Sequence, residues 1–74
     1  MSSVASVEAA YRPLQTALAK GNLTLEQRKK VVEDLNKLLP EHANKIDATK
    51  ISEQELNKAV ALGLYLAKLQ AEQL

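Results

Sequence analysis

The segment AVALGLYLAKLQA, residues 59–71, constrains the fold more than any other part of the chain. Counted at about 100° per residue, its apolar side chains cover an arc of about 220° on a helix, from Leu69 round to Leu64. An ordinary surface helix buries an arc of little more than about 100°. The segment is therefore expected to form a helix that other helices cover on more than one side.

Small residues recur at every fourth position in this segment, beginning with Ala59 and Gly63. A glycine inside a helix costs about 1 kcal/mol relative to alanine, so a close contact is expected to compensate for Gly63. Small residues between two leucine ridges form a groove that another helix can approach closely. That helix belongs either to the same chain or to a second copy, which would make a two-fold homodimer. The candidate interaction surface comprises Ala59, Leu62, Gly63, Leu66, Ala67 and Leu69.

Start and stop signals divide the chain into helices. The stretches TLEQ and SEQE fit the capping box, in which a hydroxyl and the side chain three residues later each accept an amide hydrogen. The glycine of KGN ends the first helix, and Pro40 ends the second. The sequence predicts an all-α fold, a small bundle in one domain over residues 1–74, with a short helical turn near 40–45. The three main helices are expected at about 4–20, 25–39 and 53–73.

Apolar stripes on the first two helices supply the rest of the predicted core. The first stripe comprises Val4, Val7, Tyr11, Leu14 and Leu18. The second stripe comprises Leu25, Val31, Val32, Leu35, Leu38 and Leu39. Arg28 interrupts the second stripe, and its stem is expected to cover the core edge while its charge stays in water. Pro13 lies opposite the first stripe, so the first helix either bends at Pro13 or begins there.

Composition excludes several classes of protein. The 74 residues include no cysteine, so neither disulfides nor thiolate metal sites can stabilise the small core. The net charge of +1 argues against nucleic-acid binding through bulk charge. The longest apolar run has nine residues and the first residues lack a signal-peptide pattern, so neither a membrane span nor secretion is expected. The cytoplasm is the default location.

Reactive chemistry is nearly absent from the sequence. His42 is the single histidine, and it lies in the connecting segment without a cysteine to pair with. Glu41, His42 and Asp47 lack the spacing of a metal site, and no glycine-rich loop could hold a phosphate. We therefore expect no enzymatic activity, no cofactor and no metal.

A binding surface is the remaining source of function. The sequence predicts a small non-enzymatic protein–protein interaction module, an adaptor, regulator or assembly component, whose partner is another protein or a second copy bound through the last helix.

The alternative is a helix-turn-helix-like DNA-binding protein, with GNLT as its turn and contacts from Arg28, Lys29 and Lys30. Carboxylates at helical spacing interrupt this basic cluster, which favours a solvated face. No helix pairs an apolar stripe with a lysine-rich face, so binding to a membrane surface is not expected.

Overall fold

The computed structural model describes residues 3–39 and 45–73, which form three α-helices. The helices are α1 (Val4–Ala19), α2 (Leu25–Leu38) and α3 (Glu53–Gln73). The predicted all-α bundle is confirmed, and each helix ends within one residue of its expected position. The predicted helical turn near 40–45 lies almost entirely outside the described residues.

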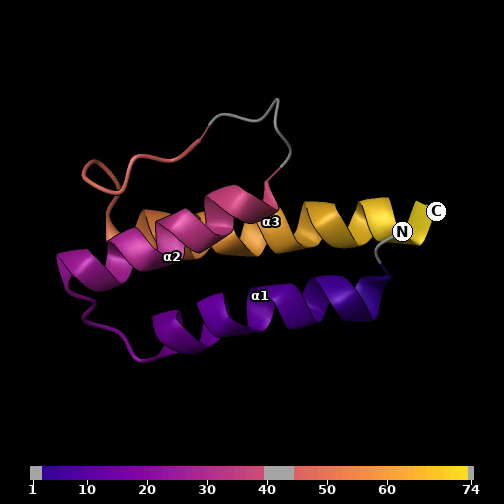
Figure 1. The fold of residues 1–74 in the computed structure, drawn as a ribbon, viewed down its shortest axis with the longest axis horizontal. Helices are drawn as coiled ribbons and strands as arrows, with labels where there is room; N and C mark the ends of the chain where they lie inside the picture. The colour runs from indigo at the N-terminus through magenta and orange to yellow at the C-terminus, as the bar shows by residue number, and fades with distance from the viewer. Residues whose placement is uncertain (1–2, 40–44, 74) are drawn as a thin grey trace.

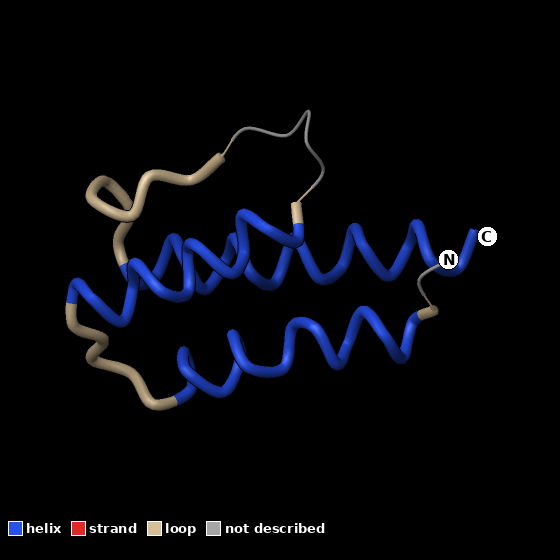
Figure 2. Tube along the Cα trace, viewed as in Figure 1, coloured by secondary structure: helices blue, strands red, loops and turns tan. Residues whose placement is uncertain are grey.

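The three helices lie side by side along the bundle (Figure 1). α1 runs antiparallel to both other helices, whereas α2 and α3 run in the same direction (Figures 1 and 2). α2 has 14 residues and α3 has 21, so the C-terminal part of α3 extends beyond the end of α2. Along this part, α1 is the helix that packs against α3 (Figure 1).

Both predicted capping boxes are present. At the start of α2, the Gln27 N–H donates to Thr24 Oγ1 over 3.2 Å, and the Thr24 N–H donates to Gln27 Oε1 over 2.8 Å. At the start of α3, Ser52 and Glu55 exchange the equivalent bonds, both of 3.1 Å. Each box satisfies two amides that a helix start would leave without partners. Local hydrogen bonding therefore determines where α2 and α3 begin.

The end of α1 needs a left-handed backbone. Gly21 has a φ of +69° and donates its N–H to the Leu18 carbonyl over 3.1 Å, and Asn22 follows with a φ of +50°. Glycine adopts this conformation without the steric cost that a Cβ imposes. α1 also continues through Pro13, so this proline does not begin the helix.

The core lies where the three helices meet. Its buried residues are Val7, Tyr11, Leu14, Leu18, Leu23, Val31, Val32, Leu35, Leu56 and Val60. The predicted apolar stripe of α2 is wider than the face that the structure buries. Leu25 at one edge of the stripe is 43% exposed, and Leu38 at the other edge is 38% exposed. These two side chains lie about 60–80° from Leu35 around the helix. α1 and α3 cover the middle of the stripe and leave its edges in solvent.

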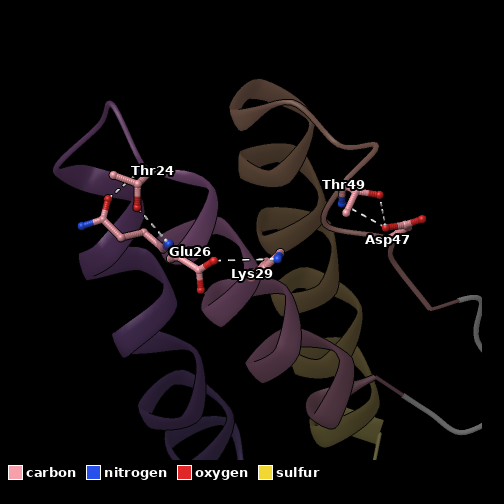
Figure 3. A network of polar contacts seen from close by, with 6 residues as sticks. Thr24, Glu26, Lys29, Asp47 and Thr49 are labelled. Atoms are coloured by element: carbon pink, nitrogen blue, oxygen red, sulfur yellow. Dashed lines mark hydrogen bonds and ion pairs between the residues drawn. The ribbon is translucent and has the colours of Figure 1, made fainter.

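Hydrogen bonds attach the described part of the α2–α3 connection to the C-terminal end of α2. The Asn36 side chain donates to the Ile46 carbonyl over 3.1 Å and accepts from the Ile46 N–H over 3.0 Å. The Lys45 ammonium donates to the Asn36 carbonyl over 3.1 Å, which places a cation at the C-terminal end of α2. Asp47 accepts from both the Thr49 hydroxyl and N–H, and these bonds lower the pKa of the Asp47 carboxyl (Figure 3).

The burial of α3 predicts unequal effects of two leucine truncations. Leu56 is fully buried and Leu62 is 58% exposed. Leu56→Ala should lower the free energy of unfolding by about 2–5 kcal/mol because it leaves a cavity. Leu62→Ala, the matched control, should change it by less than about 0.5 kcal/mol. Denaturant titrations measure both variants, and equal losses would contradict the orientation of α3.

Candidate functional site

The structure places the predicted interaction surface on two different sides of α3. Gly63 is buried, and the two alanines are partly buried against the core. Leu62 and Leu66 are exposed, and Leu69 is partly buried. The residues that face the core are Ala59, Gly63 and Ala67. The six residues therefore do not form one surface.

Tyr11 of α1 fills the space that the glycine leaves. A Cβ built on Gly63 would lie 2.9 Å from Tyr11 Oη and 3.5 Å from Leu35 Cδ1. Tyr11 is only 2% exposed, and burial raises the pKa of its phenol. The close contact that compensates for the glycine is thus made within the chain. The groove is not open to a second copy.

An exposed apolar surface lies on the side of α3 that faces away from the core. We call it the α3 ridge, and it comprises the exposed Leu62, Tyr65 and Leu66 together with the partly buried Leu69. Leu62 is 58% exposed, Tyr65 is 60% exposed and Leu66 is 51% exposed. Tyr65 is not part of the surface predicted from the sequence, although its spacing of three residues from Leu62 and four from Leu69 places all three on one face. Lys58 and Glu72, both exposed, lie at the two ends of this face.

An open hollow of about 380 Å³ runs beside the α3 ridge, between α3 and α1. An ion pair of 3.6 Å between Lys68 and Glu8 joins the same two helices. The hollow is lined by Gln15, Ala61, Leu64, Tyr65, Lys68, Leu69 and Glu72. Its mixed lining of apolar and charged side chains suits contact with another protein surface.

The basic cluster on α2 does not form an open cationic patch. Arg28 is partly buried, its Nη1 donates to the Leu23 carbonyl over 3.1 Å, and its Nε is buried without a hydrogen-bond partner among the described residues. Lys29 lies 3.8 Å from Glu26, and Lys30 lies 3.2 Å from Asp34 (Figure 3 shows the first pair). The Arg28 guanidinium is therefore less open to solvent than expected, because one of its nitrogens binds a backbone carbonyl and another is buried.

The arrangement of α1 and α2 also differs from a DNA-binding helix-turn-helix. In that motif the two helices cross at about 90–120°. α1 and α2 instead run alongside one another in opposite directions (Figure 1). The residues between them, 20–24, act as the hairpin of a bundle.

Glu53, at the start of α3, makes a polar contact with the α1–α2 turn at the same end of the bundle. Its carboxylate accepts the Leu23 N–H over 2.6 Å and the Asn22 N–H over 3.2 Å. These amides belong to the α1–α2 turn, 30 and 31 residues away in sequence. Glu53 therefore holds α3 against that turn, a role that no local sequence signal reveals.

Across residues 3–39 and 45–73, no group of three or more His, Cys, Asp or Glu side chains could hold a metal ion. Asp47 is engaged by Thr49, and Glu41 and His42 lie outside the described residues. In the same part of the chain, no helix has the length and apolar character that crossing a membrane requires.

Comparison with known proteins does not assign the chain to a family. No family model matches the chain, and no similar protein was found among curated proteins or solved structures. The α3 ridge and its surroundings are therefore the basis for a functional proposal.

The contact at Gly63 predicts a measurable coupling with Tyr11. Tyr11→Phe removes the atom nearest to a Cβ at position 63 and leaves the next ones at 3.5 Å, an ordinary contact distance. Gly63→Ala should therefore be more favourable in the Tyr11→Phe background than in the parent, by at least about 1 kcal/mol. A double-mutant cycle of unfolding free energies measures this difference. Additive effects would show that Tyr11 does not occupy the glycine site.

The Glu53 carboxylate predicts a second stability effect. Glu53→Ala removes two acceptors from backbone amides and should lower the free energy of unfolding by about 1–3 kcal/mol. Glu26→Ala, on the exposed first turn of α2, is the matched control and should cost less than about 1 kcal/mol. Thermal and denaturant unfolding of both variants would test this. A smaller loss for Glu53→Ala than for the control would refute the tethering role.

Proposed function

We propose that this chain is a small, non-enzymatic protein–protein interaction module of the cytoplasm that binds its partner through the α3 ridge. The observation that carries the proposal is the exposure of Leu62, Tyr65 and Leu66, each more than half accessible on one face of one helix. Scattered apolar residues are normal on a protein surface, whereas a contiguous apolar patch is typical of a binding site.

The surroundings of the ridge support a protein partner. Exposed Lys58 and Glu72 lie at the ends of the apolar face, as charged residues commonly lie at the rim of an interface. A helix that presents apolar side chains at spacings of three and four residues can dock against another helix or in a groove. Leucine and tyrosine side chains supply most of the surface that such docking would bury.

The basic cluster of α2 gives less support to nucleic-acid binding. Lys29 and Lys30 face carboxylates on their own helix, which reduces the positive field that phosphates require. Arg28 is partly buried and bonded to the Leu23 carbonyl, so reaching a base edge would break that contact. These contacts favour the α3 ridge as the functional surface.

The proposal predicts that polar substitutions on the ridge abolish partner binding without unfolding the protein. The test variant is Leu62→Ser/Leu66→Ser, and the matched control is Leu25→Ser/Leu38→Ser, which alters the two exposed leucines of α2. Each protein is immobilised and used to capture proteins from cells of its source organism, with circular dichroism as the check on folding.

We expect the parent and the control to retain the same proteins, or added free copies of the chain itself, and the ridge variant to lose them. Retention that is equal for all three proteins would contradict the proposal. DNA retention that Lys29→Glu/Lys30→Glu abolishes in filter binding would support the nucleic-acid alternative instead.

A further inference from the structure

We infer that the partner of the α3 ridge is a second copy of the same chain, bound antiparallel so that Lys58 of each copy faces Glu72 of the other. The inference rests on the proposed function, because it uses the same surface. It differs from pairing through the small-residue groove, which Tyr11 occupies.

The outer face of α3 carries five residues at a regular helical spacing. Successive members of this face are separated alternately by four and three residues, a repeat that keeps them on one side of a helix. The members are Lys58, Leu62, Tyr65, Leu69 and Glu72. The apolar residues are therefore bracketed by one cation and one anion.

The two charges are placed symmetrically about Tyr65. Lys58 lies seven residues before Tyr65, and Glu72 lies seven residues after it. A two-fold axis that passes beside Tyr65 and relates two antiparallel helices brings each lysine level with the glutamate of the other copy. A parallel pair would place lysine against lysine and glutamate against glutamate. Charge complementarity thus selects the antiparallel arrangement.

Lys58 and Glu72 have no ion-pair partner within residues 3–39 and 45–73. Four other lysines do form ion pairs there, namely Lys29, Lys30, Lys37 and Lys68. Glu55 lies close to Lys58, but the pKa of Glu55 is lowered mainly by hydrogen bonds from Ser52 and less by Lys58. Lys58 and Glu72 are therefore available to a second copy.

The hollow beside the α3 ridge can receive a side chain of the second copy. In the antiparallel arrangement, Leu62 of one copy lies close to the level of Lys68 of the other. Lys68, Leu64 and Leu69 line the open hollow of about 380 Å³ between α3 and α1. A leucine side chain from the second copy can enter this hollow, which would bury apolar surface on both sides of the two-fold axis.

Charge reversal provides the test, read by sedimentation equilibrium at low salt over a wide concentration range. We expect the parent to dimerise, and Lys58→Glu and Glu72→Lys each to weaken dimerisation by about tenfold, because each variant creates two like-charge contacts. An equimolar mixture of the two variants should restore parental affinity as a heterodimer. The double variant Lys58→Glu/Glu72→Lys should restore it as a homodimer. Lys50→Glu, at an exposed lysine in the connection before α3, should have no effect.

A parent that stays monomeric at the highest concentration would overturn the inference, while ridge-dependent capture of another protein would still support the proposed function. If charge reversal leaves the dimer affinity unchanged but Leu62→Ser/Leu66→Ser dissociates the dimer, the antiparallel register alone would be overturned. Dimers that survive both changes would overturn the inference and the ridge together. Circular dichroism of each variant verifies that dissociation does not reflect unfolding.

Discussion

The close approach of α1 to α3 at Gly63 determines how the rest of the bundle is arranged. A Cβ at position 63 would lie only 2.9 Å from Tyr11 Oη, so any other residue there would have to push the hydroxyl of a buried tyrosine aside. The contact fixes the rotation of α3 about its own axis, because only the face with Gly63 can come this close to α1. The cost of a glycine inside a helix is thereby offset by packing.

This rotation explains why large apolar side chains remain on the surface. With the small residues facing inward, the leucines on the other side of α3 point away from α1. α2 cannot cover them, because it is shorter than α3 and packs with α1 around the inward face (Figure 1). The apolar arc noted in the sequence is thus used twice, with one part in the core and the other forming the α3 ridge.

The sequence predicted the helices well because their signals are local. The capping boxes at Thr24 and Ser52 and the left-handed glycine at Gly21 each act within a few residues. The inward face of α3 could not be predicted, since a helix that is apolar on most sides has several faces that could be buried. The hydrogen bond that Glu53 accepts from the distant α1–α2 turn also could not be predicted from local sequence patterns. The ridge was predicted in part, and only its separation from the groove required the structure.

The most direct test of this account is a nuclear Overhauser experiment on the protein in solution. Strong cross-peaks are predicted between the Tyr11 ring protons and the Gly63 Hα protons, because the space between these residues has no room for a Cβ. The Leu62 and Leu66 methyl groups should show no cross-peaks to α1 or α2 of their own chain. Cross-peaks from the Tyr11 ring to those methyl groups, with none to Gly63, would mean that α3 is rotated and would contradict the account.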